Sequence, residues 1–454
     1  MALQLKMLSG WGNHPCEPCL VTMPEKLAQL PELVADASVR DQIARGLGRA
    51  YGDSALNRSG GVIVQTRLNR FRTFDEQTGE LECEAGVSLA EIIECLLPRG
   101  WFPPVTPGTK FVTIGGAIAA DVHGKNHHAV GSLGNFVQWL DLLLASGETL
   151  RCSPSENGPL FWATVGGMGL TGIIVRACVK LARVPSAYCR VQYRRCRDLD
   201  QTLEVLESTN SRYAYSVAWI DCLARGPRLG RSVLMLANSA AVEDLPGRLR
   251  AAALRLPTKR VLSVPCQLPG GLLNRGSVWL FNELYYRSHG DCERLVDFDS
   301  FFYPLDSLLH WNRIYGRRGF AQYQALLPPE TSRRGMAELL GEIGEAGLGS
   351  FLAVLKTSGP ATPGVLSYLY PGHTLALDLP NVGERLVKLC ARLDQILLRH
   401  GGRLYLAKDS MTDRESFAAM YPRLGEFQQL KNQYDPGRRF VSSQARRLGI
   451  VEAS

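Results

Sequence analysis

The stretch Thr113–His128, TIGGAIAADVHGKNHH, joins paired glycines, a run of small residues and a polar end. Gly115 and Gly116 allow the main chain to pass close to a ligand, because no side chain intervenes. The alanines that follow leave space for a flat group, and the polar residues from His123 onward can meet its hydrogen-bonding edge. A large planar cofactor needs a wall of this kind. A tightly packed glycine turn before a solvated polar loop would use the same residues.

A second glycine-rich segment, Ala44–Ser54, reads ARGLGRAYGDS. Its glycines leave several backbone N–H groups free, and loops of this kind form concave sites for phosphate oxygens. A long glycine turn has the same composition. A third segment, Gly166–Lys180 (GGMGLTGIIVRACVK), contains a GxGxxG match. The dinucleotide fingerprint needs a strand before the glycines and a helix after them, whereas a β-branched strand follows here, so we reject a nicotinamide site.

Composition indicates a globular chain with more than one domain. Its 454 residues exceed one ordinary core, and 45% are hydrophobic and 21% charged. The net charge of +8 favours an anionic substrate or surface, while the lack of a compact Lys/Arg run among aromatics argues against nucleic acid. The 12 scattered cysteines favour a reducing compartment. We find no apolar core of a signal peptide and no apolar run of about 20 residues that would indicate a membrane span. The spacing of the cysteines and histidines is not typical of metal ligands, so we expect no metal site.

Local patterns predict elements on either side of these segments. Pro24–Ala44 is predicted to be helical from its spaced leucines. Val62–Gln65 and Glu80–Glu84 are predicted strands. Beyond about Pro185, strands alternate with amphipathic helices, which indicates a change of domain.

Three later segments carry polar groups with functional potential. Phe320–Leu327 (FAQYQALL) alternates, which places Gln322 and Gln324 on one face of a predicted strand. Arg403–Ser410 (RLYLAKDS) is a predicted strand that ends in polar residues. Arg225–Arg275 is loop-rich and basic, which suits contact with anionic lipid headgroups. A solvated basic face explains the same composition.

Together the glycine segments resemble the vanillyl-alcohol oxidase/PCMH superfamily of flavin enzymes, and within it the members that oxidise polyprenyl-phosphate pentoses. LFWATVGGMGLTGII, RLYLAKDSMT, AMYPR and YDPGRRF extend the resemblance over nearly the whole chain. It implies an α+β, two-domain PCMH-type FAD-binding fold with an inserted substrate domain built on an antiparallel sheet. The implied parts are an FAD-binding domain at 1–186, a substrate domain at 187–402 and a C-terminal return at 403–454.

The resemblance implies that FAD is bound non-covalently. The superfamily's covalent flavin histidine is often in the pyrophosphate loop, where this chain has Arg49, Ala50 and Tyr51. FAD contacts are implied for both glycine loops and for two isolated positions. The implied FAD-binding residues are Ala44, Arg45, Gly46, Leu47, Gly48, Arg49, Ala50, Tyr51, Gly52, Asp53, Ser54, Gly108, Thr113, Ile114, Gly115, Gly116, Ala120, Asp121, Val122, His123 and Tyr405.

Two residues are implied to be catalytic. Lys408 falls on the family's active-site lysine, and a cation there would favour the alkoxide that develops when an alcohol is oxidised. It could act as an electrostatic stabiliser or, with its pKa lowered by burial, as a base. A surface lysine after a strand is the alternative. His123 could hydrogen-bond near the flavin, or could be a structural histidine.

The implied substrate-binding residues are Gln322, Gln324, Lys356, Trp219 and Tyr51. The glutamines could position sugar hydroxyls or phosphate, and Lys356 could pair with the phosphate as a point charge.

Three residues depart from the family pattern. Ala376, Thr374 and Phe302 stand where the family has a reactive cysteine, an asparagine and a tyrosine. These departures bear on the identity of the sugar or lipid and argue against covalent nitro-aromatic inhibition.

The implied activity is FAD-dependent oxidation of the 2′-hydroxyl of a polyprenyl-phosphate pentose to a 2-keto sugar. This would be the first half of an epimerisation that supplies an arabinose donor for cell-envelope glycans, and a separate NAD(P)H-dependent reductase subunit would complete it. We expect a cytoplasmic protein that is peripheral at the inner membrane, with the periplasmic face as the alternative location, and no nucleic-acid partner. The alternative functions are a soluble sugar-alcohol or aldonolactone oxidase of the same superfamily and a non-catalytic flavin-binding subunit.

Overall fold

The computed structural model of the chain describes residues 3–451. Its strands up to Lys180, apart from a two-residue strand at 101–102, form two sheets. Their central strands are apolar runs, such as GVIV at 61–64, that are buried almost throughout. The four-stranded sheet has the order β1 (Gln4–Ser9), β2 (Cys16–Thr22), β4 (Gly61–Val64), β3 (Gln42–Arg45). The five-stranded sheet has the order β5 (Phe71–Phe74), β6 (Glu80–Glu84), β10 (Ile173–Lys180), β8 (Val137–Leu143), β9 (Thr149–Cys152).

Short helices connect these strands, and two of them begin at side-chain caps. The Ser88 hydroxyl accepts the Glu91 N–H at the start of α2 (Leu89–Leu96), and the Glu91 carboxylate accepts the Ser88 N–H in return. The paired glycines lie in α3 (Ile114–Ala119), where the Thr113 hydroxyl accepts the Gly116 N–H. The other helices of this half are α1 (Leu30–Ala35), α4 (His127–Val130) and α5 (Gly158–Thr164).

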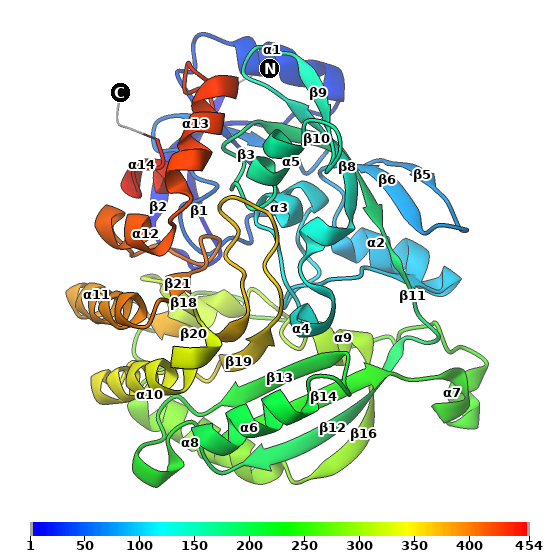
Figure 1. Cartoon of the computed structure of the whole chain (residues 1–454), viewed down its shortest axis with the longest axis vertical. Coiled ribbons are helices and arrows are strands. Elements are labelled where there is room, and N and C mark those ends of the chain that lie inside the picture. Colours follow the sequence, from blue (N-terminus) through cyan, green and yellow to red (C-terminus); the bar gives the residue numbers. More distant parts are fainter. Residues whose placement is uncertain (1–2, 452–454) are drawn as a thin grey trace.

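The middle of the chain forms one antiparallel sheet of eight strands, which occupies the lower half of Figure 1. Its order is β16 (Cys292–Asp297), β12 (Tyr188–Cys196), β14 (Ser232–Ser239), β13 (Tyr215–Ile220), β19 (Ala353–Ser358), β20 (Gly372–Pro380), β18 (Phe320–Leu327), β21 (Arg403–Leu404). Two short pairs complete the strands: β7 (Trp101–Phe102) with β11 (Ala182–Arg183), and β15 (Leu262–Ser263) with β17 (Leu308–Leu309).

The two faces of the eight-stranded sheet differ in chemistry. On β18, Tyr323 and its apolar neighbours pack into the core beneath α10 (Pro329–Ala346) and α11 (Glu384–Arg399), and α6 (Leu199–Thr209) covers the neighbouring strands. Figure 1 shows α10 and α11 on this outer side. Gln322 and Gln324 alternate with these residues and face the N-terminal half, as the pattern FAQYQALL predicts.

The C-terminal return packs on the first sheet, so both ends of the chain lie in the upper half of Figure 1. It contains α12 (Arg414–Met420), α13 (Leu424–Tyr434) and α14 (Ser443–Arg447). Phe440 forms a parallel bridge with Gln42, and Arg446 pairs with Asp41 at 2.7 Å. We therefore propose the division at 1–186, 187–402 and 403–454, with β21 of the return completing the edge of the eight-stranded sheet.

Two predicted elements are wrong in extent. Pro24–Ala44 is not one helix, because α1 covers only six residues and the chain then enters β3, which pairs in parallel with β4. Arg403–Ser410 is a strand only at its first two residues. The chain then turns, and the Lys408 N–H donates to the Tyr405 carbonyl.

The segment Arg225–Arg275 is also less irregular than its composition predicts. Within it, β14 is a largely buried strand between β12 and β13. Arg231 is buried beside Asp221 and Glu283, at 2.7 and 2.6 Å, so it does not contribute to a basic surface. The remaining helices of this half are α7 (Gly247–Arg250), α8 (Arg275–Ser288) and α9 (Phe298–Phe302).

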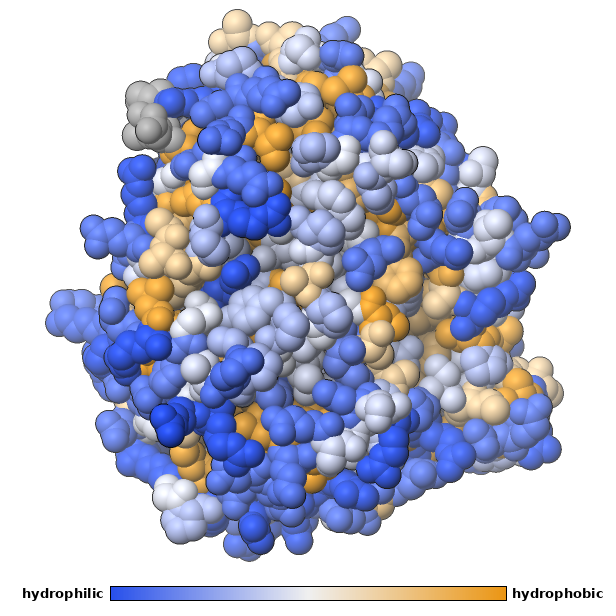
Figure 2. Space-filling model, in the orientation of Figure 1, coloured by the Kyte–Doolittle hydropathy of each residue, from blue (hydrophilic) through white to orange (hydrophobic). Residues whose placement is uncertain are grey.

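Surface hydrophobicity is uneven. The face in Figure 2 carries mainly hydrophilic side chains, with hydrophobic residues in small separate patches. Of the 15 large hydrophobic side chains that are exposed in the described part of the chain, eight lie between Val261 and Leu309. Within residues 3–451, no helix has the length and apolar character to cross a bilayer.

Candidate active site

A cavity of about 340 Å³ lies between the glycine-rich loops and the inner face of the eight-stranded sheet. One side, the loop wall, is formed by residues in the ranges 44–55, 106–124 and 168–174. The other side, the strand wall, consists of Val217, Gln322, Gln324, Val354, Lys356 and Ala376. The turn at 405–408 joins the two walls, because the Tyr405 N–H donates to Gln324 and the Ala407 carbonyl accepts from Tyr51. Seams of this kind commonly hold ligands.

Where the two glycine loops of the loop wall pass closest to each other, there is no space for a side chain. A Cβ atom on Gly46 would lie 2.2 Å from the Thr113 hydroxyl, so the two glycine loops can meet only without one. Gly108, by contrast, faces open space. Two buried side-chain nitrogens in the lining, Arg49 Nε and His123 Nδ1, have no hydrogen-bond partner among residues 3–451. A narrow cradle with unsatisfied polar atoms fits the flat, polar-edged group that the glycine loops predict.

The two arginines of the first glycine loop have different environments. Arg45 donates to the carbonyls of Ser9 and Ala55, at 2.7 and 3.2 Å, and so fixes the loop itself. The guanidinium of Arg49 stacks 4.0 Å from the Trp11 ring centroid at the cavity edge. Burial lowers the pKa of Arg49, but an arginine remains charged in either case.

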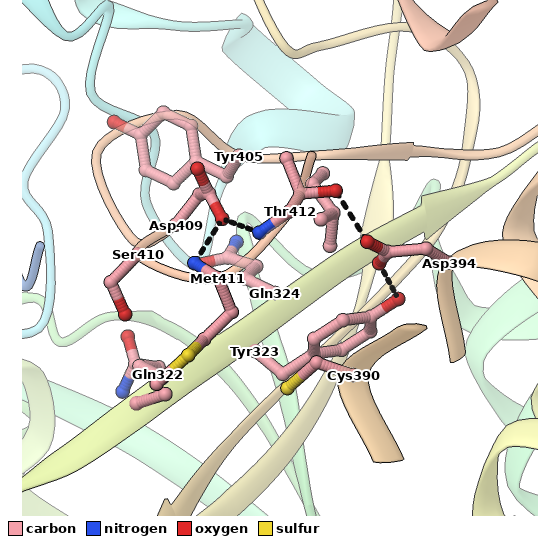
Figure 3. A pocket seen from close by; sticks show the side chains of 12 residues that line it. Gln322, Tyr323, Gln324, Cys390, Asp394, Tyr405, Asp409, Ser410, Met411 and Thr412 are labelled. Atoms are coloured by element: carbon pink, nitrogen blue, oxygen red, sulfur yellow. Dashed lines mark hydrogen bonds between the residues drawn. The ribbon is translucent and has the colours of Figure 1, made fainter. Parts of the chain in front are cut away.

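A salt-bridge network locks the first glycine loop to the turn that carries Lys408. Arg447 pairs with Asp53 at 2.7 Å and with Asp409 at 2.9 Å, and it also donates to the Thr412 carbonyl. The Asp409 carboxylate in turn accepts the N–H groups of Met411 and Thr412, as Figure 3 shows. The turn is therefore held by side chains that lie outside the cavity.

A second carboxylate, that of Asp394, supports the turn at 405–408 from the side of β18 that faces away from the cavity. The Asp394 carboxylate accepts the hydroxyl groups of Tyr323, at 2.9 Å, and of Thr412 (Figure 3). Burial raises the pKa of Asp394 to about 7. These contacts anchor the turn to the strand that bears the two glutamines.

Lys408 reaches the cavity beside Tyr51, with its Nζ 3.8 Å from the Tyr51 ring centroid. Burial lowers the pKa of Lys408 to about 7; the charge of Asp378 opposes this shift and Lys356 adds to it. Asp378 is fully buried and accepts from Gln322 at 2.6 Å. Burial raises the pKa of Asp378 to about 7, and the charge of Lys408 opposes this shift.

His123 is held by the strand wall. The Gln324 side-chain nitrogen lies 2.8 Å from His123 Nε2 and 3.3 Å from the Thr374 hydroxyl. Burial lowers the pKa of His123 well below its usual range, with Lys356 reinforcing the shift, so the ring is neutral. If Gln324 donates to Nε2, the proton of the neutral ring is on Nδ1, which makes the unpartnered atom a donor.

Two further lysines line the cavity. Lys356 forms no hydrogen bond or ion pair within the described chain, and burial lowers its pKa to about 8. Lys125 donates to the carbonyls of Phe301 and Phe302, and burial lowers its pKa to about 7. Sequence reasoning missed Lys125, although it lies in the quoted HGKNHH motif. It also missed Asp378, whose signal is a carboxylate inside the apolar run HTLALDLP.

Most of the predicted site residues line the cavity. They are Ala44, Arg45, Gly46, Leu47, Gly48, Arg49, Ala50, Tyr51, Ser54, Gly108, Thr113, Gly115, Gly116, Ala120, Val122, His123, Gln322, Gln324, Lys356, Tyr405 and Lys408. Ala376 and Phe302, two of the family departures, also line it, whereas Thr374 lies behind Gln324.

Five predicted residues are outside the lining: Gly52, Asp53, Ile114, Asp121 and Trp219. Asp53 pairs with Arg447, and Asp121 accepts the Ser132 hydroxyl at 2.6 Å. The Trp219 indole donates to the Phe351 carbonyl and packs 4.5 Å from the Tyr285 ring centroid, so it is a neighbour of the strand wall.

Comparison with known families agrees with this geometry. Residues 18–153 match the family described as FAD binding domain, which spans both glycine loops. Residues 384–448 match the family described as D-arabinono-1,4-lactone oxidase, which spans the Lys408 turn and most of the C-terminal return.

Individual relatives extend the match to the whole chain. Decaprenylphosphoryl-β-D-ribose oxidase of Mycolicibacterium smegmatis is 39% identical over 452 residues, which cover 98% of each chain. An uncharacterised Streptomyces coelicolor protein from the mprA 5′ region is 34% identical over 80% of this chain and 100% of its own length. Cytokinin dehydrogenase 5 of Arabidopsis thaliana is 27% identical over 45% of this chain and 40% of its own. The chain thus binds FAD and is an FAD-dependent oxidoreductase that belongs to the decaprenylphosphoryl-β-D-ribose oxidase family.

Proposed function

We propose that this chain oxidises the 2′-hydroxyl of a polyprenyl-phosphate pentose to a 2-keto sugar. The observation that carries the proposal is the unpaired Lys356 in a cavity that also holds Lys408 and the FAD cradle. An unpaired cation of this kind suits an anionic group such as a phosphate ester. The name of the M. smegmatis relative supports a decaprenylphosphoryl pentose as the substrate class.

We assign a separate role in the reaction to each polar residue around the cavity. The glycine loops at 44–55 and 106–124 would hold FAD, which would supply the acceptor for the hydride of the carbinol carbon. Lys408, as a neutral amine, takes the hydroxyl proton, because burial brings its pKa to about 7. Gln322 donates its side-chain hydrogen bond to Asp378 and so holds that carboxylate near Lys408. His123 Nδ1 has no partner among the described residues and can bind the sugar or the cofactor. Lys356 retains more of its charge at neutral pH, since its pKa is about 8, and it binds the phosphate.

Anaerobic bleaching of the bound flavin tests this function. A water-soluble short-chain polyprenyl-phosphate ribose should bleach it, and the same pentose without phosphate should bleach it far more slowly. The match of residues 384–448 to D-arabinono-1,4-lactone oxidase makes a phosphate-free aldonolactone the second candidate substrate. Faster bleaching by the lactone would favour that function, and no bleaching by any sugar would favour a non-catalytic flavin-binding subunit.

A separate NAD(P)H-dependent reductase is proposed as the consumer of the keto product. The chain has no dinucleotide fingerprint, so it cannot be expected to return the hydride from a nicotinamide. Mass spectrometry of the product should therefore show a keto sugar two hydrogens lighter than the substrate. Formation of the epimer by this chain alone with NADPH would contradict the need for a second subunit.

The proposed location is cytoplasmic and peripheral at the inner membrane, where a lipid-linked substrate would be met. Resistance of the protein to external protease in spheroplasts, with loss of resistance after lysis, would support it. Digestion in intact spheroplasts would place the protein on the periplasmic side.

A further inference from the structure

Helix α8 buries polar Asn282 beside Val278 and exposes most of its large apolar side chains. On the inner side, Asn282 is fully buried and donates to Asp221 at 2.7 Å, and Glu283 pairs with Arg231 at 2.6 Å. On the outer side, Trp279, Leu280, Phe281 and Leu284 are exposed, and we call these four residues the outer face. A surface helix of a soluble protein normally has the opposite arrangement.

The exposure of the outer face is large for apolar side chains in one contiguous helix segment. Trp279 is 54% exposed and Leu284 is 60% exposed. A second apolar ridge lies at the pair β15–β17, where Leu262 and Leu309 are also exposed. Contiguous exposed apolar surface marks an interaction site more often than scattered apolar residues do.

The outer face is continuous with the cavity. Phe281 packs edge-on against Phe351, at 5.6 Å between ring centroids, and the next residue, Leu352, lines the cavity. Leu308 of β17 and Leu273, just before α8, pack on the same aromatic cluster around Trp311, which also lines the cavity. An apolar chain leaving the cavity at this end would therefore meet apolar surface on both sides.

Two basic residues adjoin this surface in the chain, since Arg260 lies two residues before β15 and Arg275 is the first residue of α8. Arg255, Arg260 and Arg275 are exposed, and within residues 3–451 their guanidinium groups form no hydrogen bond or ion pair. Lys259 differs, because it is bound to Asp297 and Ser300. Unpaired arginines beside aromatic and aliphatic side chains match a bilayer interface, where anionic headgroups lie above acyl chains.

We propose that the outer face of α8, with the β15–β17 ridge, docks the protein on an anionic lipid bilayer next to the cavity mouth. The identity of the lipid-linked substrate rests on the proposed function, but the docking itself does not need the sugar. The outer face enters the headgroup–acyl boundary, and Arg260 and Arg275 bind the anionic headgroups. The lipid tail of the substrate then passes along Phe281 and Leu352 while its sugar phosphate reaches Lys356.

A matched pair of charge insertions tests the docking. Leu284→Glu adds a carboxylate to the outer face, and Val387→Glu adds one to a 50% exposed apolar position on α11. Both FAD-loaded proteins are floated with phosphatidylcholine vesicles that contain phosphatidylglycerol and no substrate. Leu284→Glu should weaken binding on the order of tenfold or more, and Val387→Glu should leave it unchanged. Equal binding by wild type and Leu284→Glu, or equal loss in both variants, would overturn the proposal.

The charge contribution is tested separately. Arg260→Glu with Arg275→Glu should weaken binding to vesicles with phosphatidylglycerol, and added salt should do the same to the wild type. Binding that responds to neither change would overturn the role of the arginines. Sedimentation velocity distinguishes a protein occupant: a dimer that Leu284→Glu dissociates would assign the outer face to a second copy and overturn bilayer docking.

Flavin bleaching by the short-chain substrate separates this inference from the proposed function. Leu284→Glu should keep the wild-type bleaching rate, since the residue is outside the cavity. Normal bleaching without vesicle binding in the wild type would overturn the docking alone. Vesicle binding without bleaching by any substrate would overturn the proposed function alone.

Discussion

The loop wall and the strand wall of the cavity are built in opposite ways. The loop wall consists largely of glycine, alanine and main chain, and it approaches its ligand by leaving side chains out. The strand wall holds long polar side chains, Gln322, Gln324 and Lys356, on one face of a continuous antiparallel sheet. The first wall is sensitive to added volume and the second to changed charge. Substitutions in the two walls should therefore separate cofactor binding from chemistry.

The largest effect is expected where the walls meet, at Lys408. Lys408→Ala should retain FAD and slow anaerobic flavin reduction on the order of a hundredfold, because it removes the group that stabilises or accepts charge at the hydroxyl. Stopped-flow reduction with the short-chain substrate measures this. Lys388→Ala is the control, since Lys388 is an exposed surface lysine. An unchanged rate in Lys408→Ala would remove Lys408 from the mechanism.

The salt-bridge network of Arg447 with Asp53 and Asp409 should be the next most sensitive feature. Arg447→Met leaves the buried carboxylates of Asp53 and Asp409 without their cation, and we expect a loss of about 2 kcal/mol in the free energy of unfolding. The value is discounted because the Arg447 side chain is 26% exposed. Urea denaturation of the FAD-loaded protein measures it. Arg399→Met, which breaks a pair at a 61% exposed arginine, should change stability by less than about 0.5 kcal/mol.

Added volume in the loop wall should weaken FAD binding without changing charge. In Gly46→Ala the new Cβ would lie 2.2 Å from the Thr113 hydroxyl, and relief of such overpacking costs about 1–3 kcal/mol. This corresponds to FAD binding roughly ten- to a hundredfold weaker, measured by titration of the apoprotein. Gly425→Ala, where an added Cβ meets nothing within 4 Å, should bind normally. Normal FAD affinity in Gly46→Ala would show that the two loops can separate without consequence.

The smallest expected effect is a pH shift. Lys408 must be neutral to act as a base, so wild-type flavin reduction should rise as pH passes through about 7. Asp378→Asn removes the negative charge that raises the pKa of Lys408, so the rise should move to lower pH, by about one unit. A pH series of single-turnover reductions measures the shift. A wild-type rate that instead falls as pH rises through 7 would make Lys408 a cationic stabiliser.

The sequence predicts the loop wall better than the strand wall, for a physical reason. A glycine loop that contacts a cofactor is built from consecutive residues, so its sequence alone indicates it. Ala44–Ser54 and Thr113–Gly116 are two such loops. Gln322 and Gln324 are also predicted to share a face, because strand alternation is local. FAD, the fold class and the family are confirmed by comparison. The roles of individual residues stay predictions.

What the sequence missed depends on contacts between distant segments. The pKa of Asp378 is raised by its burial between distant segments, and the hydrogen bond from Gln322, which lies opposite it in register on a neighbouring strand, lowers it in part. Trp219 is placed beside Tyr285 by the packing of α8, which no local pattern around Trp219 indicates. Pro24–Ala44 has helical spacing, yet parallel pairing of its last residues with β4 overrides it.

The Arg447 lock also sets the order of events during synthesis. Asp53 and Arg447 are 394 residues apart in the chain, so the first glycine loop is made long before its partner. Domains fold as they emerge from the ribosome, but this loop cannot be fixed to the Lys408 turn until residue 447 has been added. The FAD-binding half therefore remains incomplete while the segment that forms the eight-stranded sheet is translated. We therefore expect the FAD site to be completed late in biogenesis, once two segments made far apart in time have come together.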